Sequence, residues 1–84
     1  PNPYNPLSGP CNITIKGLDK RPVKVELFNL KGQLLGILYE GIPLDDKLMF
    51  SFNGSMKTKK LNSGIYFIHI QQNQRKLVHK FILQ

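Results

Sequence analysis

The stretch SGIYFIHIQQNQRKLVHKFIL, residues 63–83, holds two alternating apolar segments on either side of a short polar turn. Successive side chains of a strand point to opposite faces, so Tyr66, Ile68 and Ile70 share one face of the first segment. The polar run QNQ separates this segment from the second one, KLVHKFIL at 76–83. Two such segments around a short turn predict an antiparallel β-hairpin at the end of the chain.

The same alternation recurs upstream, where apolar residues again occupy every second position of short segments. QLLGILYE at 33–40 is rich in β-forming residues and carries Gly36, which predicts a bulge there. The inward-facing positions predicted from these patterns are Cys11, Ile13, Ile15, Val23, Val25, Leu27, Leu48, Phe50 and Phe52, and the aromatic Phe28 and Tyr66 are also assigned to the core.

Turn sequences separate the predicted strands, and no segment has the three-to-four-residue apolar spacing of a helix. Short strands that recur every 8–12 residues or so are typical of β-sandwiches and barrels. The sequence therefore predicts an all-β fold, an immunoglobulin-like antiparallel β-sandwich of about seven strands, with residues 1–84 as a single domain.

The 84-residue chain is 40% hydrophobic and carries a net charge of +7. A chain of this length buries roughly 60–65% of its unfolded surface, which leaves little core for a deep catalytic cleft. We therefore expect a protein that is not an enzyme and needs no cofactor. Its apolar runs are far shorter than the roughly 20 residues that cross a bilayer. The positive charge favours acidic partners such as an anionic polysaccharide or a lipopolysaccharide-rich surface, but the presence of only two arginines argues against nucleic-acid binding.

Residue types that often carry chemistry lie here in patterns that favour structural roles. Cys11 alternates with Ile13 and Ile15, which predicts a buried thiol. His69 and His79 lie on the two strands of the hairpin and could be cross-strand neighbours, but no acid has the spacing to supply a third metal ligand. The sequence therefore predicts no metal site and no catalytic residue.

The chain opens with PNPYNP, a run of prolines and asparagines with one tyrosine. Proline fixes φ and lacks a backbone N–H, so residues 1–8 are predicted to stay extended and outside the centre of a sheet. Either Tyr4 or Leu7 is expected to pin this opening segment to the sandwich. A start on Pro1 favours excision of the chain from a longer precursor.

Four stretches together, in this order and spacing, resemble the C-terminal sorting domain of proteins exported by the type IX secretion system of Bacteroidetes. They are PNPYNP at 1–6, VKVELFNLKGQLL at 23–35, SGIYFIHI at 63–70 and KLVHKFILQ at 76–84. The residues that fit the motifs of that family are Pro1, Asn2 and Pro3 in the opening, Gly64 and Tyr66 in the Gly-x-Tyr motif, and Lys76 and Lys80 in the basic terminal motif.

The resemblance implies a non-catalytic export address that is recognised by outer-membrane secretion machinery, carries an upstream cargo domain, and ends at Gln84. It implies a secreted or cell-surface location. Lys76 and Lys80 share a strand face with Val78 and Ile82, which suits strand addition or docking on a receptor but equally suits an edge protected by lysines.

Two other functions remain open at the level of sequence. The first is an accessory binding or spacer module of a secreted glycan-degrading enzyme, with Tyr4 or Tyr39 contributing to a polysaccharide-binding face. The second is the immunoglobulin-like module of flagellar hook-capping proteins, which the chain also resembles. Phe52-Asn53-Gly54 stands where that module prefers Trp-Asp-Gly, which weakens the second alternative.

Overall fold

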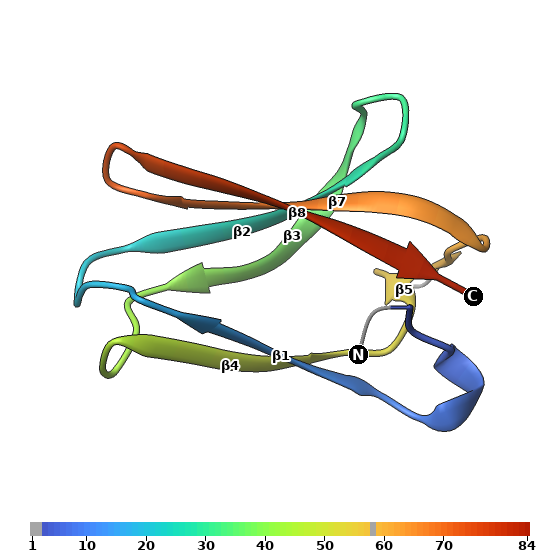
Figure 1. Cartoon of the computed structure of the whole chain (residues 1–84), viewed down its shortest axis with the longest axis horizontal. Coiled ribbons are helices and arrows are strands. Elements are labelled where there is room, and N and C mark those ends of the chain that lie inside the picture. The colour runs from blue at the N-terminus through green and yellow to red at the C-terminus, as the bar shows by residue number, and fades with distance from the viewer. Residues whose placement is uncertain (1–2, 58) are drawn as a thin grey trace.

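A computed structural model describes residues 3–57 and 59–84 and places most of them in two β-sheets that face each other (Figure 1). Pro1, Asn2 and Thr58 lie outside the described residues. The elements in chain order are η1 (Pro6–Ser8), β1 (Cys11–Lys16), β2 (Val23–Asn29), β3 (Leu34–Gly41), β4 (Lys47–Phe52), β5 (Ser55–Met56), β6 (Lys59–Lys60), β7 (Gly64–Gln72) and β8 (Arg75–Leu83).

The larger sheet has the strand order β3-β2-β7-β8, and the smaller sheet pairs β1 with β4. All the strand pairings are antiparallel, and β5 and β6 form a separate short ribbon. The β7–β8 hairpin pairs Gly64 with Leu83 at one end and Gln72 with Arg75 at the other. The predicted all-β sandwich and its terminal hairpin are therefore confirmed.

The side chains that alternate inward on both sheets form one buried cluster, because each strand turns every second residue to the opposite sheet. The cluster comprises Tyr4, Cys11, Ile15, Leu18, Val23, Val25, Leu27, Leu48, Phe52, Tyr66, Ile68, Ile70, Phe81 and Leu83. Ile13 and Phe50 are partly buried against it, and Cys11 is a buried free thiol as predicted.

Two predictions about the larger sheet are wrong. Phe28 follows the inward-facing Leu27, so it lies on the outer face, where its ring centroid is 4.1 Å from that of His69. Gly36 pairs regularly with Leu27, whereas the register shifts of β2 against β3 fall on either side of this pair. The bulges therefore flank Gly36 instead of lying at it.

The opening segment is held at the end of β8 by Tyr4. The Tyr4 N–H donates to the carbonyl of Ile82, and the Gln84 N–H donates to the carbonyl of Tyr4, each at 2.8 Å. This single parallel bridge lies at the edge of the sheet, as the prolines predicted, but the prediction of an extended segment is wrong for Pro6–Ser8, which form the 3-10 helix η1 behind the capping side chain of Asn5. The Tyr4 side chain is 3% exposed, whereas Leu7 is 89% exposed, so Tyr4 alone of the two candidates pins the segment.

Tyr4 also connects the two sheets. Its ring centroid lies 6.3 Å from that of Phe52 on β4 and 6.0 Å from that of Phe81 on β8. Its hydroxyl donates to the carbonyl of Gly9 at 2.7 Å, so the polar end of the ring is satisfied within the core.

Gln72 closes the opposite end of the sandwich. Its side chain is 3% exposed, yet all its polar groups bond to the loop between β1 and β2. The amide nitrogen of Gln72 donates to the carbonyls of Asp19 and Arg21, and its oxygen accepts from the Asp19 N–H at 2.9 Å. A buried amide that is satisfied in this way holds the loop against the end of β7.

Replacing Tyr4 should test the attachment of the opening segment. Tyr4→Ala removes a buried aromatic ring, and we expect it to lower the free energy of unfolding by about 3–5 kcal/mol. Tyr4→Phe keeps the ring but leaves the Gly9 carbonyl unpaired, which should cost about 1 kcal/mol. Urea denaturation measures both values, with the exposed Leu7→Ala as the matched control. A Tyr4→Ala protein as stable as the Leu7→Ala protein would contradict this account.

Gly54 should not tolerate a side chain, because its φ is +85° and an added Cβ would lie 2.9 Å from Cγ of Pro6. Gly17 provides the control, since its φ is +77° but nothing lies within 4 Å of the added Cβ. Both alanine variants should lose about 1–2 kcal/mol for the positive φ alone. Gly54→Ala should lose more, and Pro6→Ala in the same chain should recover part of the difference. Equal losses at the two glycines would show that Pro6 does not pack on Gly54.

Candidate functional site at the C-terminal strand

The strand β8 forms one edge of the larger sheet, and its register against β7 decides where its side chains point. Phe81 and Leu83 face the core, so the alternating set Lys76, Val78, Lys80 and Ile82 faces outward, as predicted. Both lysines are exposed. The outer face of β8 thus combines basic and apolar side chains.

The residues predicted for sorting occupy three separate places. Pro3 is exposed beside Tyr4, and Pro1 and Asn2 lie outside the described residues. Lys76 and Lys80 lie on the outer face of β8. The role of all these residues in sorting stays a prediction.

Gly64 and Tyr66 begin β7 and make contacts that support the fold. Tyr66 is buried, and its hydroxyl donates to the carbonyl of Asn62 at 2.6 Å. A tyrosine whose hydroxyl bonds a few residues upstream is the tyrosine corner of immunoglobulin-like sandwiches. Gly64 is the first residue of β7 and has a φ of +156°. The Gly-x-Tyr motif therefore has a structural role whatever the partner.

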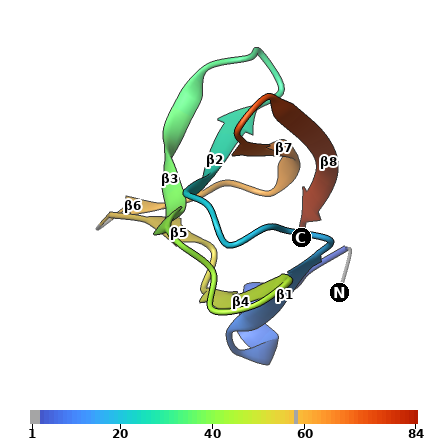
Figure 2. The same cartoon turned by 90° about the vertical axis from the view of Figure 1, so that its left-hand side faces the viewer.

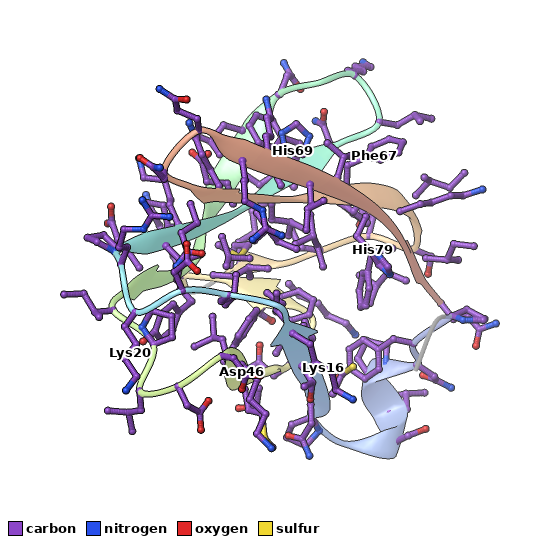
Figure 3. The ribbon with its side chains drawn as sticks, turned by 60° about the vertical axis from the view of Figure 1, so that its left-hand side comes forward. Lys16, Lys20, Asp46, Phe67, His69 and His79 are labelled. Atoms are coloured by element: carbon purple, nitrogen blue, oxygen red, sulfur yellow. The ribbon has the colours of Figure 1, made fainter. Side chains whose placement is uncertain are left out.

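The prediction that His69 and His79 are cross-strand neighbours is wrong, because the register of the hairpin is offset by one residue. His69 pairs with Val78, and His79 pairs with Ile68, so the two imidazoles lie on opposite faces of the sheet. Figure 3 shows His69 with Phe67 on the outer side and His79 on the side that faces β1. Within residues 3–57 and 59–84, no cluster of His, Cys, Asp and Glu could hold a metal ion.

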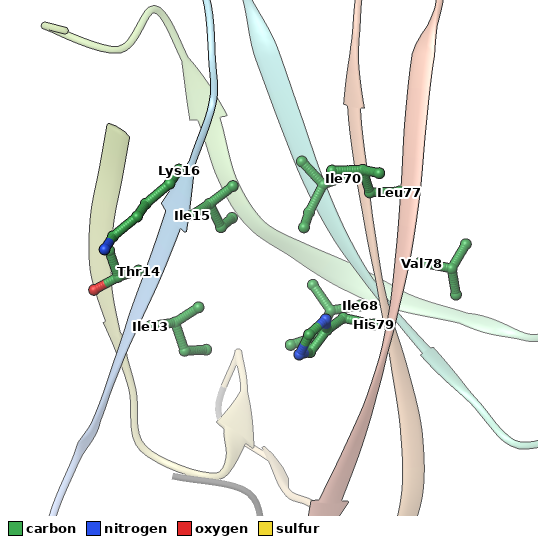
Figure 4. A pocket seen from close by; sticks show the side chains of 9 residues that line it. All are labelled: Ile13, Thr14, Ile15, Lys16, Ile68, Ile70, Leu77, Val78 and His79. Atoms are coloured by element: carbon green, nitrogen blue, oxygen red, sulfur yellow. The ribbon is translucent and has the colours of Figure 1, made fainter. Parts of the chain in front are cut away.

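An apolar groove of about 330 Å³ separates the edge strands of the two sheets, β1 and β8 (Figure 4). Figure 2 shows the two strands one above the other along the same side of the sandwich. The lining residues are Ile13, Thr14, Ile15 and Lys16 of β1, Ile68 and Ile70 of β7, and Leu77, Val78 and His79 of β8. The side chains of Thr14, Lys16 and Val78 point away from the groove, so these residues border it with their backbone.

The backbone geometry of β8 follows from its contacts with the opening segment. The carbonyl of Ile82 and the N–H of Gln84 both point to the outer edge, where they bond to Tyr4. Alternate residues of a strand direct their backbone groups to the same side. Val78 has the parity of Ile82, so its N–H and carbonyl point to the outer edge, along the groove.

Basic residues flank the two strands that border this groove. Lys16 lies on β1 and Lys76 on β8, and both are exposed. Arg75 spans one end of the groove, where its guanidinium donates to the carbonyl of Gly17 at 2.9 Å. None of the lining residues is acidic, and Asp19 in the adjoining loop is already paired with Arg21. The Arg21 guanidinium accordingly lowers the pKa of the Asp19 carboxyl.

The groove was not anticipated from the sequence. Leu77 and His79 have the parity of the buried Phe81, yet Leu77 is 48% exposed because no strand of the smaller sheet covers it. The alternation in RKLVHKFIL places Leu77 and His79 on the inner face, which is the one signal that could have revealed an uncovered inner position.

The polysaccharide-binding face proposed around Tyr4 does not form, because Tyr4 is buried in the core. Tyr39 is partly buried and stacks on Phe50, with ring centroids 6.1 Å apart. Tyr4 therefore offers no accessible ring face to a sugar, and Tyr39 offers only a partly exposed ring.

On the outer face, the environment of His69 favours the neutral imidazole. Burial lowers its pKa below the ordinary value of 6.5, and Lys76 lowers the pKa further, whereas Glu26 opposes both effects. Glu26 on β2 is the cross-strand partner of His69, while Lys76 lies on β8.

The stability of the fold should therefore fall as the pH drops through 6.5, because the unfolded chain binds a proton on this imidazole more tightly than the folded chain does. The difference in unfolding free energy between pH 7.5 and 5.5 should be smaller in His69→Gln than in the wild type. NMR titration should show that Lys76→Gln raises the His69 pKa. A wild-type His69 pKa at or above 6.5 would contradict the described environment.

Comparisons with known proteins bear on the function of β8 and of the groove beside it. In the described part of the chain, no helix has the length and apolar character to cross a membrane. Neither the curated proteins nor the solved structures contain a match to this chain. The family described as "Secretion system C-terminal sorting domain" matches residues 1–84, which is the whole sequence. The chain belongs to this family of type IX secretion sorting domains, which indicates export to the cell surface or the medium.

Proposed function

We propose that this domain is a non-catalytic address that directs an upstream cargo across the outer membrane through the type IX secretion machinery. The family match over residues 1–84 is the observation that carries this proposal. The domain itself supplies recognition, and the cargo supplies whatever activity the whole protein has.

The architecture supports this role in two ways. The opening segment is fixed at the edge of the sandwich by Tyr4, so a cargo can precede it without entering the core. The strand β8 forms the edge of its sheet opposite to β3 and exposes Lys76 and Lys80 on its outer face. A receptor can reach this strand while the fold stays intact.

The alternative of a polysaccharide-binding accessory module gains no support from the described residues, since the tyrosines proposed for it are buried or stacked on another ring. The flagellar alternative also has no particular feature in its favour here. We therefore argue only the sorting function.

Export of a reporter tests the proposal directly. A fluorescent protein with a signal peptide is fused ahead of residues 1–84 and expressed in a bacterium with an active type IX system and in a mutant without the translocon. We expect the reporter at the surface or in the medium of the competent strain alone. A folded reporter that stays in the periplasm of both strains would refute the proposal.

Charge reversal is a better probe of β8 than truncation, since removal of Phe81 and Leu83 would destroy the core. Lys76→Glu with Lys80→Glu should reduce export if the basic outer face is recognised. Lys59→Glu with Lys60→Glu is the matched control, because it makes the same charge change on the exposed ribbon strand β6. Thermal denaturation must show that both double variants fold.

A further inference from the structure

We propose that the groove between β1 and β8 binds an extended segment of a partner protein, which adds as a strand to the edge of β8 and inserts its apolar side chains between the sheets. The segment is expected to carry acidic residues beside its apolar ones. This inference rests on the proposed sorting function, because it assigns the partner to the secretion machinery.

The first support is a strand edge to which the described residues add no neighbouring strand at Val78. β8 is the last strand of its sheet, and the described opening segment covers it only near Ile82 and Leu83. The N–H and carbonyl of Val78 point outward by the same parity as the groups that bind Tyr4. An exposed edge of this kind is a template for an added strand, whose backbone supplies the affinity.

The second support is the shape and lining of the groove. Ile13 and Ile15 enter it from β1, and Leu77 enters it from β8 (Figure 4). Its volume of about 330 Å³ is roughly twice that of an apolar cavity that holds one benzene-sized group. Side chains at positions i and i+2 of a strand lie about 6.8 Å apart on one face. The volume of the groove is therefore sufficient for two apolar side chains, at positions i and i+2 of an added strand.

The third support is charge, which also selects the occupant. Arg75 lies at one end of the groove, Lys16 and Lys76 flank it on β1 and β8 with their side chains directed away from its interior, and its lining contains no acid. The net charge of +7 makes a second copy of this chain an unfavourable occupant, because the two basic edges would repel. A partner segment with aspartate or glutamate flanks is complementary in charge. Such a segment also uses the outward backbone groups of Val78, which an acyl chain cannot do.

The binding test uses the 84-residue chain and a synthetic peptide of alternating valine and threonine with two aspartates at each end. We expect amide shifts in NMR spectra that are largest in β8 and extend to the groove residues of β1 and β7. Control peptides carry lysine flanks, or the same residues with the valines grouped together. Absence of shifts at millimolar peptide, or shifts centred elsewhere, would overturn the proposal. Shifts caused by vesicles of anionic lipid but not by the peptide would also overturn it.

Val78→Pro is the decisive variant, because it removes the outward N–H without breaking the ladder to β7, a substitution that an edge strand tolerates. We expect it to weaken peptide binding about tenfold or more. Val78→Ala keeps the N–H and should bind within about twofold of the wild type. Lys16→Glu with Lys76→Glu should reverse the preference toward the lysine-flanked peptide. A folded Val78→Pro protein that binds like the wild type would refute strand addition.

The reporter fusion then separates this inference from the proposed function. Export of the wild-type fusion together with failure of Val78→Pro, but not of Val78→Ala, supports the groove as the recognition site. Export of all three fusions would refute the groove and leave the sorting function intact. Failure of the wild-type fusion would refute the sorting function itself, while the peptide experiment would still decide whether the groove binds a strand.

Discussion

The attachment of Tyr4 to the end of β8 is the interaction on which the rest of the sandwich depends. Two backbone hydrogen bonds join the opening segment to Ile82 and Gln84, and the ring contacts Phe52 and Phe81 from opposite sheets. A small domain has few large side chains with which to join its sheets, so one buried aromatic ring contributes a large share of the contact. The two chain ends are therefore stabilised together.

The same attachment explains why one side of the sandwich is open. The opening segment lies at the end of β8 instead of extending beside β1, so the smaller sheet has only β1 and β4. Tyr4 closes one end of the interior, and Gln72 closes the other through its bonds to the loop at Asp19 and Arg21. On the opposite side, the interior is covered by stacking of Tyr39 on Phe50. The side between β1 and β8 keeps an apolar groove that is lined by strands of both sheets.

The strands were predictable because burial of one face imposes a two-residue period, and Val23, Val25 and Leu27 follow it. Features that depend on the register between strands were not predictable in this way. The positions of His69 and His79 depend on a one-residue offset across the hairpin, which no local pattern reveals. The outward position of Phe28 follows from the same alternation, but Phe28 was assigned to the core because it is a large aromatic residue. The sequence also could not decide whether Tyr4 or Leu7 pins the opening segment. That outcome depends on which side chain reaches Phe52 and Phe81, which is set by the tertiary structure.

The residues that match the sorting motifs divide into two physical groups. Gly64 and Tyr66 support the start of β7, through a positive φ and through the hydrogen bond to Asn62, so any change there alters the fold before it alters recognition. Lys76 and Lys80 are exposed on β8, and their replacement changes charge without opening the core. A loss of export therefore has different meanings in the two groups. The groove adds a third group, because Val78 presents backbone to the edge and a side chain to solvent, so recognition through the backbone can be removed while the surface chemistry stays nearly constant.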